Sequence, residues 1–149
     1  MPFDPKDFEQ ADRFVEENIT EAVLETALGV FTRLINATTP GNPTRWENPR
    51  SAPQGYVGGA ARGNWQIGIG SPPRNETGQI DPGGSATIEA GSGTLDRYKL
   101  GPKIFIVNNR PYIKRLNDGH SQAIPVGFVQ KSIQAGGETI KRFKVRVVR

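Results

Sequence analysis

The single histidine of the chain, His120, is the residue with the clearest capacity for acid–base chemistry. It lies in the sequence Gly-His-Ser-Gln, two residues after Asp118, so a Ser-His-Asp site would have to be built around it. The chain contains no G-x-S-x-G turn that would present a serine nucleophile. A loop histidine that makes one hydrogen bond explains the same residues, and we expect His120 to have this structural role.

Metal and phosphate chemistry has little support in the sequence. With no cysteine and one histidine, the chain cannot form thiolate or multi-histidine metal sites, and no spaced series of Asp and Asn resembles a calcium loop. Glycines cluster at 58–59, 68–70, 83–84 and 91–93, but none of these runs belongs to a phosphate-binding or dinucleotide-binding motif. We expect them to supply turns, and we predict no cofactor, no metal and no enzymatic activity.

The first 36 residues have the strongest structural pattern. Asp4-Pro5 is typical of a helix start, with a capping carboxylate followed by proline at the first helical position. Apolar residues then recur in steps of three and four along one face, and acidic residues occupy the other positions. This pattern predicts one long helix over 5–36, with Asn18 or Thr20 as an alternative point at which a second helix could begin.

A segment rich in proline and glycine follows at 38–63. It contains four prolines and five glycines without a sustained period, which predicts an extended loop arm. Trp46 and Tyr56 within this arm are large apolar residues that a free loop does not normally display. They either fold back onto the domain or dock on a neighbouring molecule, and the sequence leaves both alternatives open.

Two short segments have the pattern of strands. In residues 64–70, Trp65, Ile67 and Ile69 alternate with smaller or polar residues, which predicts a strand with one buried face and Trp65 in the core. Residues 103–107, Lys-Ile-Phe-Ile-Val, predict a second and largely buried strand. Residues 86–98 fit either a weak helix interrupted by two glycines or a strand and a turn.

Beyond residue 110 the sequence predicts a turn, a helix and a terminal strand. Pro111 opens a helical turn through Leu116, which Gly119 is suited to end in the left-handed conformation. A helix follows from Pro125 to the glycine pair at 136–137. Residues 141–149 then alternate basic and apolar types, which predicts a basic, strand-like tail. The tail and the arm supply the candidate subunit interface: Trp46, Tyr56, Arg142, Phe143, Lys144, Val145, Arg146 and Val147.

Charge is distributed unevenly along this 149-residue chain, which is expected to form a single domain. Residues 1–25 hold eight acids and two bases, whereas residues 97–149 hold twelve bases and two acids. The two ends could pair within one chain, could stack head to tail between copies, or could form two solvated faces. The tail could instead add to a neighbour's sheet or contact DNA phosphates. A small basic nucleic-acid-binding module is therefore the alternative function, although the acidic helix dilutes the basic character.

Several motifs occur in an order that resembles a known family. They are Thr-Pro-Gly at 39–41, Ala-Arg-Gly-Asn-Trp-Gln at 61–66, Ile-Gly-Ile-Gly at 67–70, and the run from Val107 to Val129, which contains Asn-Asn-Arg-Pro-Tyr and Gly-His-Ser-Gln. Together they resemble the neck or tail-completion (minor tail) protein family of long-tailed bacteriophages, similar to the lambda-like tail completion protein. The residues that carry the resemblance are Arg62, Asn64, Trp65, Asn108, Asn109, Pro111, Tyr112, Leu116, Gly119, His120, Ser121, Gln122, Pro125 and Gly127.

The resemblance implies an α+β fold, in which a long N-terminal helix packs on a small antiparallel sheet. It implies a structural virion protein without catalysis, which assembles as a ring, often sixfold, in the neck or tail and in the host cytoplasm before that. The partners would be other copies, the head connector or adaptor, and tail terminator or tube proteins, with genomic DNA passing nearby and no membrane. Two departures from the family pattern are the insertion from Gly41 to Gly59 and the basic tail.

Overall fold

A computed structural model describes residues 4–142 of the chain; residues 1–3 and 143–149 lie outside the described part. Its longest element, α1 (Pro5–Ala37), confirms the predicted helix as one uninterrupted element of 33 residues. The helix begins as expected, because the Asp4 carboxylate accepts a hydrogen bond of 2.9 Å from the backbone N–H of Lys6. It ends where the Thr38 hydroxyl donates to the Leu34 carbonyl at 2.7 Å.

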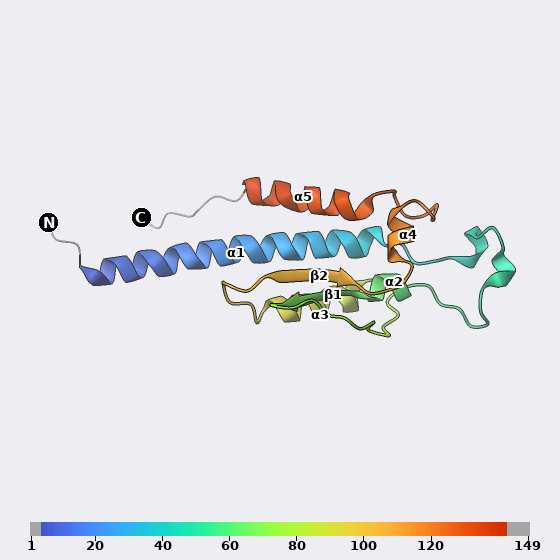
Figure 1. The fold of residues 1–149 in the computed structure, drawn as a ribbon, viewed down its shortest axis with the longest axis horizontal. Helices are drawn as coiled ribbons and strands as arrows, with labels where there is room; N and C mark the ends of the chain where they lie inside the picture. The colour runs from blue at the N-terminus through green and yellow to red at the C-terminus, as the bar shows by residue number, and fades with distance from the viewer. Residues whose placement is uncertain (1–3, 143–149) are drawn as a thin grey trace.

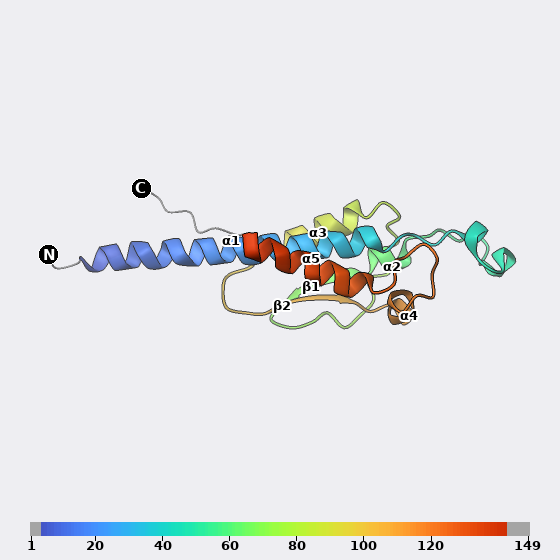
Figure 2. The same cartoon turned by 90° about the horizontal axis from the view of Figure 1, so that it is seen from above.

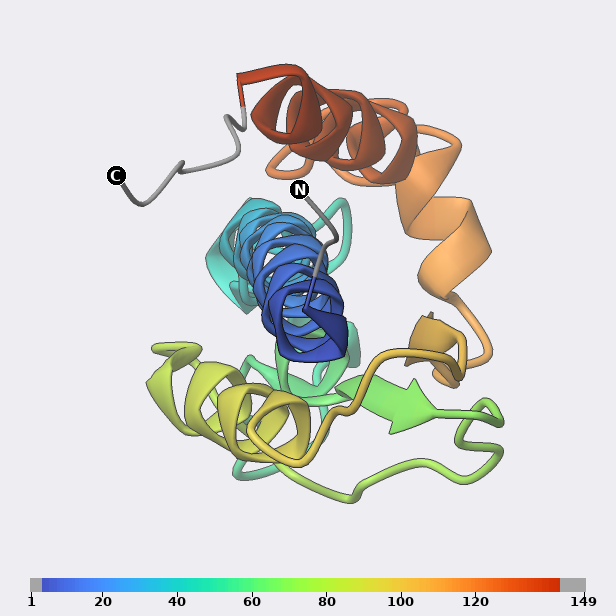
Figure 3. The ribbon, with the colours of Figure 1, turned by 90° about the vertical axis from the view of Figure 1, so that its left-hand side faces the viewer.

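The elements lie in layers on two sides of α1 (Figures 1 and 3). Helix α5 (Phe128–Arg142) packs along one side, whereas helix α3 (Ser85–Leu95) and the two-stranded sheet cover the opposite side. Strand β1 (Trp65–Ile69) pairs antiparallel with β2 (Ile104–Asn108), with Ile67 opposite Ile106. This arrangement confirms the expected α+β fold with a long helix on a small antiparallel sheet.

The core lies between the C-terminal half of α1, the sheet, α3 and the start of α5. Phe31, Ile35 and Phe128 are almost fully enclosed. The Trp65 ring meets the Phe128 ring edge to face, with 6.3 Å between the centroids, and its indole nitrogen donates to the Thr38 hydroxyl at 2.8 Å. The predicted core position of Trp65 is therefore confirmed, and the edge-to-face pair is a favourable aromatic geometry.

Three connections complete the fold. The predicted arm leaves the body as an extended excursion, seen at the right of Figures 1 and 2, and contains two single turns of 3₁₀ helix at Pro43–Arg45 and Pro49–Ser51. The arm returns through a short helix, α2 (Ala60–Gly63), that the sequence did not predict. The predicted turn after Pro111 is α4 (Ile113–Asn117), and Gly119 follows it with a φ of +101°, as expected for a left-handed helix end.

The structure decides one open alternative and corrects one expectation. Residues 86–98, for which the sequence left both a helix and a strand with a turn open, contain most of helix α3 (Ser85–Leu95), so the helix alternative is confirmed. Gly91 lies where any side chain would overlap the Phe31 ring, which lets α3 approach α1 closely. Helix α5 does not end at the glycine pair 136–137 but continues to Arg142. Lys141 and Arg142 are therefore helical and not the start of a strand, while Phe143, Lys144, Val145, Arg146 and Val147 lie outside the described residues.

The physical reason for the longer helix is packing against α1. Gly136 sits where a side chain would collide with Val30, so the missing side chain lets α5 approach α1 closely. Burial along a neighbouring helix outweighs the low helix propensity of glycine, which amounts to about 1 kcal/mol per residue.

Candidate interaction surfaces

A concave surface lies at the end of the molecule from which the arm projects. This cleft has a volume of about 960 Å³ and is lined by the arm on one side and by residues 110–124 on the other. Seven of the family-motif residues line it: Arg62, Tyr112, Leu116, Gly119, His120, Ser121 and Gln122. Trp46 and Tyr56, predicted as interface residues, line the arm side. The structure thus gathers most of the Val107–Val129 motif and the two arm aromatics around one hollow, which we call the arm cleft.

Arg62 fixes the base of the arm cleft. Its guanidinium donates to three backbone carbonyl oxygens, those of Thr38 at 2.9 Å, Pro82 at 2.6 Å and Asn36 at 3.1 Å. Burial lowers the pKa of Arg62, against the opposite effect of the nearby Asp81 carboxylate. The side chain remains charged, because an arginine is protonated at any physiological pH. Arg62 therefore joins the end of α1 to the loop that precedes α3.

The three motif asparagines hold backbone segments together beside the cleft. The buried Asn64 donates to the Ala60 carbonyl at 2.7 Å and accepts from the Thr77 N–H at 2.8 Å. Asn108, at the end of β2, donates to the Ala61 carbonyl at 2.8 Å. Asn109 donates in the same way to the carbonyls of Pro73 at 2.9 Å and Asn75 at 3.1 Å. These three side chains have a structural role, because their amide groups donate hydrogen bonds to backbone carbonyl oxygens.

Arg110 and Tyr112 form the wall opposite the arm. The Arg110 guanidinium carbon lies 4.8 Å from the Tyr112 ring centroid, and its Nη1 is 2.8 Å from Glu76 Oε2. Burial by itself lowers the pKa of Arg110, but its contacts with Tyr112 and Glu76 outweigh this effect and raise it. Across the cleft, burial and the proximity of Tyr112 raise the pKa of Tyr56, against the opposite effect of Arg110. The two walls are therefore close enough to interact electrostatically.

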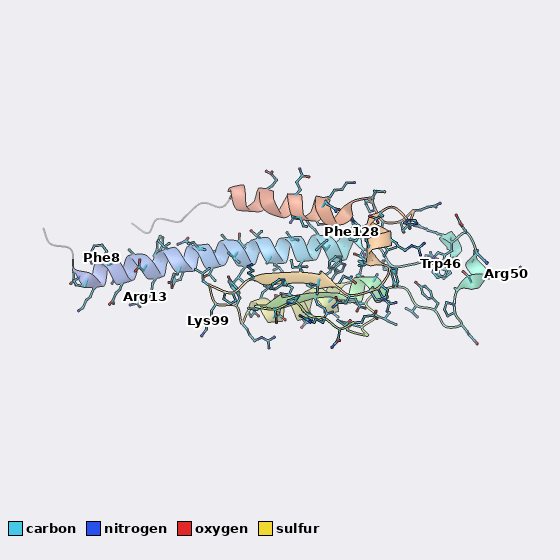
Figure 4. The ribbon with its side chains drawn as sticks, in the orientation of Figure 1. Phe8, Arg13, Trp46, Arg50, Lys99 and Phe128 are labelled. Atoms are coloured by element: carbon cyan, nitrogen blue, oxygen red, sulfur yellow. The ribbon has the colours of Figure 1, made fainter. Side chains whose placement is uncertain are left out.

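The arm is internally ordered. The Trp46 and Tyr56 rings meet edge to face, with 5.1 Å between centroids. Gly41 leaves the space that the Tyr56 hydroxyl occupies, and Gly58 lies directly against the backbone of Gly41, so the two ends of the arm touch. Figure 4 shows Trp46 on the arm, with Arg50 at its outer end. The arm therefore carries a packed aromatic pair beside the arm cleft, and both rings line that cleft.

The loop between α4 and α5 contains the remaining motif residues. Pro125 and Gly127 shape its end, since the Pro125 carbonyl accepts from the Phe128 N–H and Gly127 has a φ of +70°. Ser121 accepts from the Ala123 N–H at 3.3 Å, and His120 is exposed. Among the side chains described between residues 4 and 138, none forms a hydrogen bond with the His120 imidazole, and Ser121 bonds only to the backbone of Ala123. The neighbouring Pro111 is exposed at the start of the α4 turn.

The opposite end of the molecule has a different character. The N-terminal half of α1 projects beyond the other elements, with Phe8 and Arg13 along it in Figure 4. Val15 and Ile19 are 49% and 45% exposed. A second and shallower groove, of about 680 Å³, lies between the acidic residues of this half and the loop at Tyr98–Leu100. The two ends of the protein are therefore unlike in both shape and charge.

The sequence did not predict two residues that cap helices beside the arm cleft. Asp81 is buried and accepts from the Gly84 N–H at 3.0 Å and from the Thr87 N–H and hydroxyl at 2.8 and 2.7 Å, so it caps α3. Asn117 caps α5 in the same manner through the Val129 N–H at 3.0 Å. An Asp or Asn ahead of a helix is a signal for such a cap, but α3 itself was ambiguous in the sequence.

Comparisons with protein families, with curated proteins and with solved structures find no match to this chain. Within residues 4–142, no helix combines the length and apolar character required to cross a membrane. The same residues contain no group of three His, Cys, Asp or Glu side chains placed to hold a metal ion. The two ends of the molecule, one concave with an arm and one a projecting acidic helix, are the features on which a functional proposal rests.

Proposed function

We propose that this chain is a structural virion protein of a long-tailed bacteriophage, and that it forms a ring in the head–tail neck or tail completion assembly. The proposal combines the motif resemblance of residues 107–129 with the position of those residues around the arm cleft. Its partners would be further copies of the chain, the head connector or adaptor, and the tail terminator or tube.

The observation that carries the proposal is the arm with its cleft. The arm carries the Trp46–Tyr56 pair, in which Trp46 is half-buried and Tyr56 is 38% exposed, and neither ring belongs to the core of the domain. Aromatic side chains at a protruding surface are typical anchors of protein interfaces. The motif residues of the opposite wall, such as Tyr112 and Leu116, give this end a concave partner surface. The site is therefore equipped for protein contact.

A ring follows from the difference between the two ends. Subunits that meet through two unlike surfaces form a closed ring when the rotation between them closes, and a filament when it does not. Here one end is a hollow with an aromatic arm, and the other is a helix that carries eight acids and two bases within residues 1–25. Unlike surfaces of this kind favour a head-to-tail contact over a symmetric dimer.

The test is assembly of the purified protein over a range of concentrations, measured by native mass spectrometry and negative-stain imaging. Wild type is expected to form closed rings. W46A/Y56A is expected to need a protein concentration at least about tenfold higher to assemble, because loss of an anchor side chain from an interface commonly costs more than about 1 kcal/mol of binding free energy. The control is I80A, which removes an apolar side chain that is 56% exposed outside the arm. If W46A/Y56A and I80A assemble at the same protein concentration, the arm is not part of the subunit interface.

The same samples address the nucleic-acid alternative. A wild-type protein that stays monomeric at all concentrations, and binds duplex DNA with an affinity that falls steeply with salt, would replace the ring proposal with a nucleic-acid-binding module. The basic excess of residues 97–149 is the feature that such a module would use.

A further inference from the structure

The side of α1 that faces α5 continues beyond the end of α5. Gly136 of α5 lies against Val30 and Thr26 of α1. At 100° per residue, Ile19 and Val15 lie on the same side of the helix as Thr26 and Val30, in steps of four to seven residues. Ile19 and Val15 are 45% and 49% exposed, whereas Val30 packs against the core cluster. We call Val15 and Ile19 the α1 stripe.

The course of α5 leads the chain onto this stripe. Helix α5 runs antiparallel to α1 and ends about halfway along it (Figures 1 and 2). From Gly136, which is opposite residues 26–30, the six residues to Arg142 advance about 9 Å toward the N-terminal end of α1. Arg142 therefore lies near the level of Ala22, one turn before Ile19.

Residues 143–149 have the length needed to cover the stripe. Seven extended residues span about 23 Å, which equals about 15 residues of helix rise. An extended segment that starts at the level of Ala22 would be long enough to pass Ile19 and Val15 and to reach the first turns of α1. In such a segment the third residue, Val145, would be level with Val15.

The composition of the segment matches the surface it would meet. Phe143, Val145 and Val147 alternate with Lys144 and Arg146, so an extended segment has one apolar and one basic side. The α1 stripe is apolar, and Asp12 and Glu16 stand beside it on the helix. The apolar side of the segment would bury the stripe while its basic residues lie over an acidic helix.

We propose that residues 143–149 lie along the Val15–Ile19 stripe of α1 in the same chain. The acidic N-terminal and basic C-terminal parts of the chain could pair within one chain, stack between copies, or remain as two solvated faces. The proposal chooses the first of these alternatives. It does not depend on the proposed virion function, because the contact would form in the monomer. It also assigns the tail to its own subunit and leaves the arm for contacts between subunits.

Disulfide mapping tests the contact, and the absence of cysteine from the chain makes the experiment free of background thiols. V15C/V145C is compared with E17C/V145C under mild oxidation at low protein concentration. Glu17 is exposed at nearly the same height but on the opposite side of α1. We expect V15C/V145C to close an intramolecular disulfide at least about tenfold faster than the control pair, because proximity raises the effective thiol concentration.

Equal rates for the two pairs, or a disulfide that forms only between chains, would overturn the proposal. A second measurement avoids cysteine: deletion of residues 143–149 is expected to raise hydrogen exchange of the α1 amides at 11–22 several-fold and to leave those at 30–37 unchanged. No change at 11–22 would likewise exclude the contact.

Discussion

The hydroxyl of Thr38 stabilises two structures at once. It accepts the indole N–H of Trp65 at 2.8 Å and donates to the Leu34 carbonyl at 2.7 Å, and the residue is fully buried. T38V keeps the shape but leaves the buried indole N–H without an acceptor. We expect it to lower the free energy of unfolding by about 1–3 kcal/mol. T38S keeps the hydroxyl and is expected to lose about 1 kcal/mol for one methyl group. Urea denaturation compares them, and equal stability of the two variants would mean that the hydrogen bond does not contribute.

Asp81 couples stability to pH. Burial by itself raises the pKa of this carboxyl, but hydrogen bonds from Thr87 and Gly84, together with nearby Arg62, outweigh burial and lower the pKa below its ordinary value of 3.8. Because the folded pKa is the lower one, the stabilisation is complete above the unfolded pKa and is lost as the pH falls through the folded pKa.

The variant D81N tests this linkage. At neutral pH it is expected to be less stable than wild type by about 1–3 kcal/mol, since an amide cannot accept all three donors of the cap. The difference should begin to shrink as the pH falls below about 3.8, the ordinary pKa of the carboxyl, and should be lost as the pH passes through the lower folded pKa, where the folded wild type takes up its proton. Denaturation series from neutral to acidic pH give the measurement. D96N, which changes an exposed carboxylate at the other end of α3, is expected to stay within about 0.5 kcal/mol of wild type at neutral pH. A D81N deficit that persists undiminished in acid would contradict the assignment.

At the scale of elements, the outcome of sequence reasoning follows from where the stabilising contacts lie. Helix α1 and strands β1 and β2 were predicted within one residue or so at each end, because their signals are local caps and periodicities. Helix α3 was left as one of two alternatives and the end of α5 was placed too early, in both cases at glycines, because Gly91 and Gly136 are explained only by their contacts with Phe31 and Val30 of α1. Packing between helices far apart in sequence overrides local propensity.

The candidate site was predictable to a similar degree. The motif residues of the Val107–Val129 run were identified, and most of them meet at the arm cleft. Their individual contacts were not predictable, since Asn108 bonds to a carbonyl 47 positions away and Arg62 to one 24 positions away. Such pairings depend on how the elements pack, which a single sequence does not specify.

The glycine pair of α5 gives a prediction at this scale. G136A places a methyl group against Val30 and is expected to destabilise the protein by about 1–3 kcal/mol, because the two helices cannot approach as closely. G137A has open space and is expected to stabilise by about 0.5–1 kcal/mol, the helix-propensity difference between alanine and glycine. Thermal and urea denaturation measure both effects. If the two variants shift stability in the same direction, Gly136 is not the contact point between α1 and α5.

At the scale of the whole molecule, a central body carries two projections. The body holds the hydrophobic core, while the arm and the N-terminal half of α1 extend from opposite ends (Figures 1 and 2). None of the buried core residues belongs to the arm between Gly41 and Gly58. Ordering an arm that adds nothing to the core costs conformational entropy and does not stabilise its own domain. We therefore expect the arm to function in contacts outside the subunit.

Replacement of residues 42–57 by two glycines separates these contributions. The backbones of Gly41 and Gly58 already touch, so a short turn can join them without displacing α1 or α2. We expect the midpoint of thermal unfolding to stay within about 4 °C of wild type, because the core is untouched. Ring formation should be lost, because the Trp46–Tyr56 surface is absent. Circular dichroism and native mass spectrometry on the same sample give the two readouts. A shortened protein that unfolds would make the arm part of the domain's own stability, and one that still forms rings would place the subunit contact elsewhere on the body.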